Sequence, residues 1–176
     1  QLLDCALRVF VAKGFHAASM DDIAESAQVS KPVLYQHFDS KHDLYLEVLR
    51  SHVDELLDRI RVALESTTDN RRRVEAAVDT FFAFADNQTR GFRLVFSSEP
   101  ADDDVRRELD RATDGCIDAV HDLVRGDSGL DVHRSRLLAV GLVGASRVSA
   151  GHWIDAGRPI PRTDAVATTI ALCWGG

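Results

Sequence analysis

Residues 17–41 read AASMDDIAESAQVSKPVLYQHFDSK, and this stretch decides the fold of the amino-terminal part of the chain. Its hydrophobic spacing predicts two short helices, from about Ser19 to Ala27 and from Lys31 to Phe38, joined by a tight turn. Ser19 followed by Asp22 is a variant of the capping box that begins a helix. Two such helices form the helix-turn-helix arrangement, in which the second helix reads DNA.

The residues expected to face outward from these helices suit contact with DNA. Lys31 and Lys41 can pair with phosphates, and Tyr35 can donate a hydrogen bond to one. Gln36 can read a base edge, and Val33 can touch a thymine methyl group. The helix starts at Ser19 and Ser30 can also offer backbone N–H groups to phosphates. The alternative is a solvated polar face on small amphipathic helices of any bundle.

Helical periodicity continues along the rest of the 176 residues and predicts an all-α chain of about nine helices. The run Phe92–Ser97 is too brief to distinguish a short helix from a turn. We expect a helix-turn-helix DNA-binding domain over residues 1–47 and an effector-binding and dimerisation domain over 48–176. Three scattered cysteines, an absent signal-peptide pattern and the lack of a long apolar run predict a cytoplasmic protein without a membrane partner.

Charge is distributed unevenly along the chain. The formal net charge is −7, which argues against a general nucleic-acid coat. The only lysines are Lys13, Lys31 and Lys41, and the other basic residues are arginines. Two of these lysines bracket the second helix of the motif, so the DNA interpretation rests on where the few cations lie.

The stretch from Phe10 to Leu49 resembles the N-terminal domain of TetR-family transcriptional regulators. The matching strings are AASMDDIA over 17–24, VSKPVLYQHF over 29–38, and SK over 40–41. Two positions depart from the family pattern: Gln28 replaces a turn glycine at some conformational cost, and Pro32 replaces a glycine in a first helical turn that tolerates proline. The resemblance implies a TetR-like fold, a homodimer, and DNA contacts from Lys31, Val33, Tyr35, Gln36, His37 and Lys41.

Candidates for an effector site follow in the second domain. Five of the eight phenylalanines fall between Phe81 and Phe96, where an ordinary core and an effector cavity both fit the pattern. TetR-like regulators generally carry such a cavity. Arg147 lies among small and apolar residues, so it needs an acidic side chain or an anionic ligand as partner. The predicted ligand-binding residues are Phe81, Phe84, Phe92, Phe96, Cys116, Val120, Ser146 and Arg147.

The segment Leu137–Ala145 is apolar on every side, which predicts burial on every side. One small chain offers limited cover for such a helix, although burial within the monomer is the alternative. We therefore expect the last two helices to form a two-fold interface. Its predicted residues are Val140, Val143, Val148, Ile170 and Trp174.

Strings scattered over the later chain resemble one actinobacterial branch, the regulators of fatty-acid synthesis that sense long-chain acyl-CoA. They include CIDAV over 116–120, DSGL over 127–130 and WGG over 174–176, while 147–152 departs from that branch. The partners implied are double-stranded operator DNA, a small apolar or amphipathic effector and a second copy, with no cofactor or metal. We expect a repressor, with an activator of fatty-acid synthesis genes as the alternative. A helical small-molecule-binding protein or an enzyme is more remote, since no catalytic motif is present.

Overall fold

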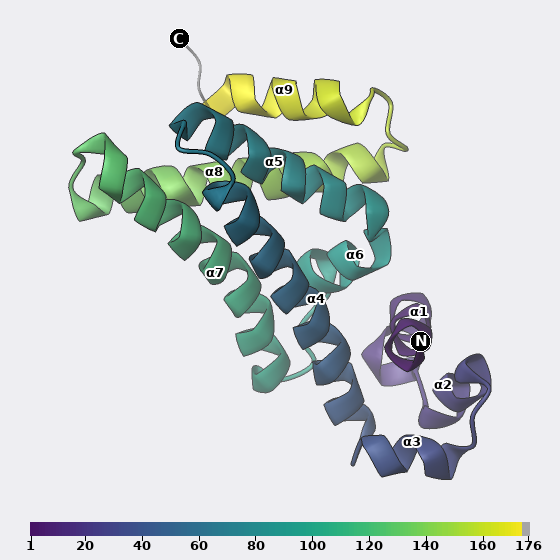
Figure 1. Cartoon of the computed structure of the whole chain (residues 1–176). Helices are drawn as coiled ribbons and strands as arrows, with labels where there is room; N and C mark the ends of the chain where they lie inside the picture. The colour runs from purple at the N-terminus through teal and green to yellow at the C-terminus, as the bar shows by residue number, and fades with distance from the viewer. Residues whose placement is uncertain (174–176) are drawn as a thin grey trace. The chain divides into compact units, whose positions relative to one another are not determined.

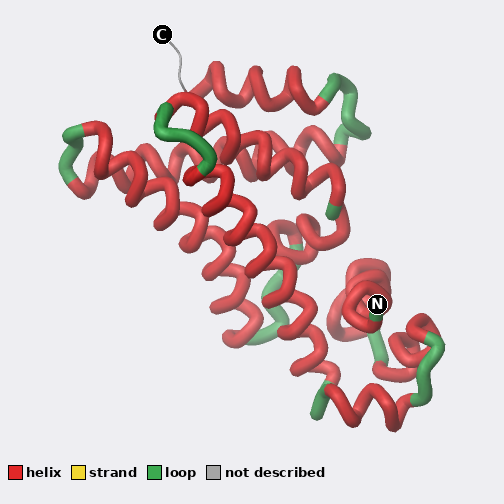
Figure 2. Tube along the Cα trace, in the orientation of Figure 1, coloured by secondary structure: helices red, strands yellow, loops and turns green. Residues whose placement is uncertain are grey.

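A computed structural model describes residues 1–173 of the chain, and these form nine α-helices without a strand (Figures 1 and 2). The all-α prediction is therefore confirmed, and the open segment at Phe92–Ser97 is helical. The helices are α1 Leu2–Ala17, α2 Met20–Ala27, α3 Lys31–His37, α4 Lys41–Glu65, α5 Asn70–Asn87, α6 Thr89–Ser97, α7 Asp103–Ser128, α8 Val132–Asp155 and α9 Arg162–Cys173.

The chain divides into two compact units, each built from segments that are distant in sequence. The first unit combines Gln1–Asp54 with Arg90–Asp110, and the second combines Glu55–Thr89 with the chain from Arg111 onward. Helices α4 and α7 therefore contribute residues to both units. The domain limits 1–47 and 48–176 remain a prediction.

The first unit is built around the apolar faces of α1 to α4. Ala6, Ile23, Leu34 and Leu44 are fully buried there. The ring of Phe10 meets that of Tyr45 edge to face, with 4.9 Å between centroids. The backbone of α1 kinks at Gly14, which has φ 76° and ψ 164°. Residues with a Cβ rarely adopt this conformation.

A second glycine brings α6 against α4 in this unit. A Cβ added to Gly91 would lie 2.2 Å from Cδ2 of His52, so only glycine permits this approach. The His52 ring is buried, and its Nδ1 lies 2.8 Å from the carbonyl oxygen of Val48. The small residue therefore sets how closely the two helices pack.

The second unit has a core of aromatic and small side chains. Helices α5, α8 and α9 pack against one another and lie side by side in Figure 1. The rings of Phe82 and Trp153 lie 5.7 Å apart between centroids. Arg158 donates from Nε to Oδ1 of Asp86 at 2.7 Å, which ties the end of α8 to α5.

Helix α8 is not buried on every side by its own chain. Leu137 is 70% exposed and Val148 is 63% exposed. By length and composition alone α8 is long and apolar enough to cross a membrane, which is weak evidence for a single helix. A third of its most apolar window is buried among the described residues. The expectation of burial on every side is thus not met within one copy, and α8 keeps an uncovered apolar face.

Candidate nucleic-acid interface

Helix α2 begins at a complete capping box. Ser19 Oγ accepts from the backbone N–H of Asp22 at 3.1 Å, and the Asp22 carboxylate accepts from the backbone N–H of Ser19 at 3.0 Å. Lys13 donates to the same carboxylate at 2.7 Å, and this hydrogen bond is the main reason that the pKa of Asp22 falls to about 2. The predicted box is confirmed, with aspartate in the place of the usual glutamate.

The turn between α2 and α3 uses a left-handed residue that is not glycine. Gln28 has φ 56° and ψ 39°, a left-handed conformation at the position where the resembled family usually has glycine. The backbone N–H of Val29 donates to the carbonyl of Ala24 at 3.0 Å and closes the end of α2. Ser30 then occupies the N-cap of α3 without a side-chain cap bond, and Pro32 lies in the first turn.

Helix α3 has one buried and one exposed face. Leu34 is fully buried against the rest of the unit. Tyr35 is 45% exposed, and Gln36 and His37 are exposed beside it. Val33 is partly exposed. The arrangement brings together the side chains that the sequence assigned to the outward face.

Lys31, at the start of α3, is held by a carboxylate of α2. Its Nζ lies 2.9 Å from Oδ2 of Asp21, and this hydrogen bond raises the pKa of the lysine. Both side chains are exposed, and exposed ion pairs are weak, so a phosphate could replace the carboxylate. Asp21 was missed from sequence because it pairs across the turn, where no helical spacing links the two positions.

Lys41 has a structural role that the sequence did not indicate. Its Nζ donates to the carbonyl oxygens of Phe15 and Ala18 at 2.8 and 2.9 Å, and it lies 4.6 Å from the centroid of the Phe15 ring. The ammonium thus satisfies carbonyls that the end of α1 leaves open. A phosphate contact at Lys41 stays a prediction, made by a group that already holds the fold together.

The eight residues predicted to bind an effector fall in different units. Phe92 and Phe96 belong to α6 in the first unit, with ring centroids 5.0 Å apart. In the second unit the candidates on α5 and α7 are buried, and burial raises the pKa of the Cys116 thiol to about 12. Ser146 is buried as well and donates to the carbonyl of Leu142 at 2.8 Å, whereas Arg147 is half-buried. The buried candidates lie in the interior of the second unit.

A surface pocket of the second unit lies elsewhere. It has a volume of about 570 Å³ and opens between α4 and α5, around Val62, Ala76 and Ala83. Its lining does not include the predicted effector residues.

Comparison with known proteins identifies the family. The model of bacterial regulatory proteins of the tetR family matches residues 2–48. The HTH-type transcriptional activator FasR of Mycolicibacterium smegmatis is 51% identical over 177 residues, which cover 100% of this chain and 81% of the relative. The chain belongs to the TetR family.

Solved structures of the same fold support this assignment. A TetR-like regulator from Rhodococcus sp. RHA1 matches 98% of this chain and 91% of its own, with a TM-score of 0.83 and 25% identity. FadR of Bacillus subtilis, solved in complex with stearoyl-CoA, matches 99% and 97%, with a TM-score of 0.82 and 15% identity. The TetR-like fold is thus confirmed. The chain is a transcriptional regulator and not an enzyme.

The two serines at helix starts provide a matched pair for testing the cap. We expect Ser19→Ala to lower the free energy of unfolding by about 1 kcal/mol, because the hydroxyl satisfies an open N–H of α2. Ser30→Ala should change it by less than about 0.5 kcal/mol, since Ser30 makes no side-chain cap bond. Urea denaturation followed by circular dichroism measures both, and equal losses would contradict the assigned cap.

Proposed function

We propose that this regulator binds a two-fold operator as a homodimer in the cytoplasm, through α3, and that an apolar or amphipathic effector controls the binding. The observation that carries the proposal is the division of α3 into a buried face at Leu34 and an exposed face of polar side chains. A seven-residue helix held in this way projects hydrogen-bonding groups into solvent. The proposed DNA contacts are Ser19, Ser30, Lys31, Val33, Tyr35, Gln36, His37 and Lys41.

These contacts divide into positioning and reading. Lys31 and Tyr35 have the chemistry to bind phosphates, which fixes the register of the protein on DNA. Gln36 matches the hydrogen-bonding edge of adenine, and Val33 matches the thymine methyl group. At Ser19 both the hydroxyl and the backbone N–H are engaged with Asp22, so a phosphate there would compete with the capping box. A dimer would place two such helices on half-sites about 34–36 Å apart.

Substitutions should separate reading from positioning. Gln36→Ala should cost about 1–3 kcal/mol on the preferred operator and weaken discrimination at one base position. Lys31→Gln should weaken binding to all sequences and lower the salt dependence by about one phosphate. Arg71→Gln is the control, since this exposed arginine pairs with Glu75 on α5. Fluorescence anisotropy with DNA selected by the protein measures these effects. If Gln36→Ala and Lys31→Gln both bind this DNA with the affinity and salt dependence of the parent protein, the contacts are refuted.

The dimer proposal rests on the uncovered apolar face of α8 and α9. Val140 and Val148 are exposed on α8, together with Leu137 and Leu138, and Leu172 is exposed on α9. Val143 and Ile170 are buried by their own chain, so they would support the interface from beneath. Trp174 lies outside the described residues. Burying this face against a second copy would remove apolar surface from water, the main driving force of association.

A charge placed on this face should separate the subunits. Val148→Glu would bury an unpaired carboxylate in the interface, and we expect the 19.4 kDa monomer to become the main species. Val62→Glu is the control, because Val62 is 68% exposed on α4 and carries the same change of charge and size. Sedimentation velocity at micromolar concentration distinguishes the variants, and a monomeric parent protein would overturn the dimer.

The effector proposal draws on the apolar interior and on the compared proteins. Phenylalanines and small side chains fill the second unit, which suits an acyl chain better than a polar ligand. FadR of Bacillus subtilis shares the fold and carries stearoyl-CoA in its solved structure, so a long-chain acyl-CoA or fatty acid is the class to test. The effector would act by binding one conformation of the regulator better than another.

One relative bears on whether the regulator represses or activates. FasR of Mycolicibacterium smegmatis is a transcriptional activator and is 51% identical to this chain. This similarity supports the alternative of activation over the repression expected from the family at large. A reporter gene behind the selected operator decides between the two.

Stearoyl-CoA tests the effector class directly. At about 100 times its Kd, a ligand of the folded state should stabilise the protein by about 2.7 kcal/mol and raise Tm by about 5–10 °C. Free CoA is the control, because it lacks the acyl chain. Differential scanning fluorimetry with a series of acyl-CoAs and fatty acids measures the shift. If no chain length raises Tm, the effector class is wrong, whereas operator binding is tested separately.

A further inference from the structure

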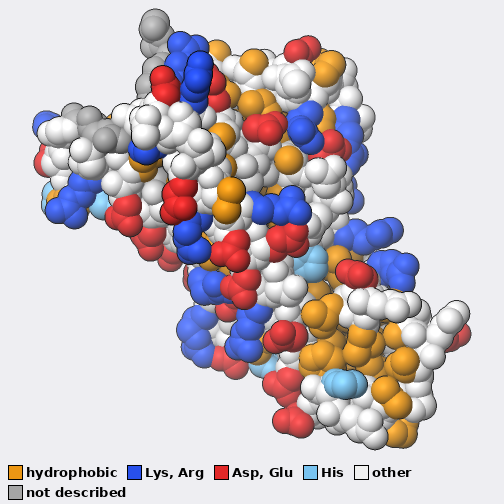
Figure 3. Space-filling view, in the orientation of Figure 1, with side chains coloured by type: hydrophobic (Ala, Val, Ile, Leu, Met, Phe, Trp, Pro, Cys, Tyr) orange, Lys and Arg blue, Asp and Glu red, His pale blue; other side chains and the backbone are white. Residues whose placement is uncertain are grey.

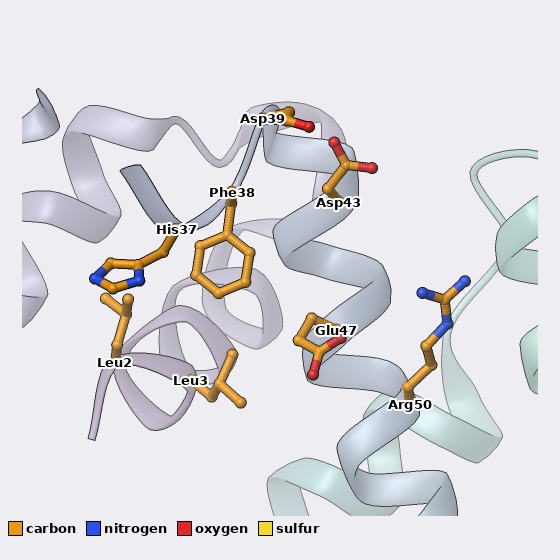
Figure 4. Close-up of a pocket in the computed structure, with 8 residues that line it drawn as sticks. All are labelled: Leu2, Leu3, His37, Phe38, Asp39, Asp43, Glu47 and Arg50. Atoms are coloured by element: carbon orange, nitrogen blue, oxygen red, sulfur yellow. The ribbon is translucent and has the colours of Figure 1, made fainter. Parts of the chain in front are cut away.

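A groove on the first unit adjoins the end of α3. It has a volume of about 640 Å³ and lies between the start of α1, the end of α3 and the first turns of α4 (Figure 4). Of the proposed DNA contacts, only His37 lines it. The lining residues are Leu2, Leu3, His37, Phe38, Asp39, Asp43, Glu47 and Arg50.

One part of the groove is apolar and accessible. Leu2, Leu3 and Phe38 are only partly buried, and Figure 4 shows Phe38 between the leucines and the side chains of α4. Figure 3 shows hydrophobic side chains gathered over α1, with acidic side chains beside them toward α4. Contiguous apolar surface with a polar rim is typical of an interaction site.

The other part of the groove is acidic and incompletely neutralised. Asp43 and Glu47 are exposed one turn apart on α4, about 6 Å along its axis. Neither Asp39 nor Glu47 has an ion-pair or hydrogen-bond partner among the described residues. The one arginine of the lining, Arg50, lies 3.9 Å from Glu108, outside the groove. The groove therefore presents more negative charge than its own residues balance.

This combination favours one kind of occupant. The carboxylates repel a phosphate backbone, so DNA is a poor fit. Two carboxylates four residues apart match basic side chains at the same spacing on a second helix, and the apolar floor matches the hydrophobic face of that helix. We propose that the groove docks a basic amphipathic helix of a partner protein, with lysine or arginine on Asp39, Asp43 and Glu47 and apolar side chains on Leu2, Leu3 and Phe38.

The chemistry separates this proposal from operator binding. Lys31, Tyr35 and Gln36 do not line the groove, so a variant that empties it of charge leaves those DNA-reading side chains in place. A helix docked here would lie beside α3 at the protein surface. His37 is the one proposed DNA contact that also lines the groove, so the docked helix and the operator would meet at that side chain.

A synthetic helix tests the proposal. The probe is a fluorescent peptide of about 18 residues, or five helical turns, with leucines at helical spacing and lysines at every fourth position. A second peptide replaces each lysine with glutamate. Fluorescence anisotropy measures binding to the full chain at two salt concentrations. We expect the basic peptide to bind, more weakly at high salt, and the acidic peptide to bind at least tenfold more weakly.

Matched variants assign the binding to the groove. Asp39→Asn with Glu47→Gln should lower the affinity for the basic peptide about five- to tenfold, which is the contribution of two exposed charge contacts. The control pair is Asp58→Asn with Asp122→Asn, which changes the net charge equally on two exposed residues of the second unit. Equal weakening by both pairs would show attraction to bulk charge and overturn the proposal.

Three further outcomes would also overturn it. Equal binding of the acidic peptide would show nonspecific apolar contact. A change in sedimentation on Asp39→Asn with Glu47→Gln would assign the groove to a second copy. Loss of operator affinity in the same variant, measured with peptide absent, would assign it to DNA. Peptide binding that depends on the groove pair alone, with sedimentation and operator affinity unchanged, supports the proposal and stands whether or not the effector class is correct.

Discussion

The ammonium of Lys41 joins the two ends of the helix-turn-helix, because it links the start of α4 to the end of α1. It lies at the start of α4 and binds the carbonyls of Phe15 and Ala18 at the end of α1, more than twenty residues earlier. The kink at Gly14 turns the end of α1 so that these carbonyls are free to accept. Everything between Ala18 and Lys41, including α2 and α3, is thereby closed into one loop, and its interior is filled by Ile23 and Leu34.

The same unit keeps its few lysines in ordered positions by pairing them with aspartates. Lys13 is bound to Asp22 and Lys31 to Asp21, while Lys41 is bound to backbone carbonyls. The net charge of −7 does not by itself exclude phosphate contacts, because the position of each cation counts more than the total. The exposed Lys31–Asp21 pair costs little to exchange for a phosphate, whereas the Lys41 contacts are part of the fold.

The surfaces left uncovered indicate where other molecules belong. The exposed apolar side chains of α8 and α9 on the second unit are the surface that we propose a second copy covers. The groove beside α3 on the first unit mixes apolar and acidic side chains and suits a basic helix. The interior of the second unit is rich in phenylalanine, and an effector there would act by binding one conformation of the regulator better than another.

Local pattern in the sequence was sufficient for the elements of the motif. Ser19 with Asp22 predicted the start of α2, and hydrophobic spacing predicted which face of α3 is buried, because each signal acts within one or two helical turns. The left-handed turn at Gln28 was implied by the family resemblance instead. Tertiary structure alone decided the role of Lys41, the pairing of Asp21 with Lys31, and which apolar residues of α8 stay exposed. These features depend on residues brought together by folding, and no periodicity along the chain records such contacts.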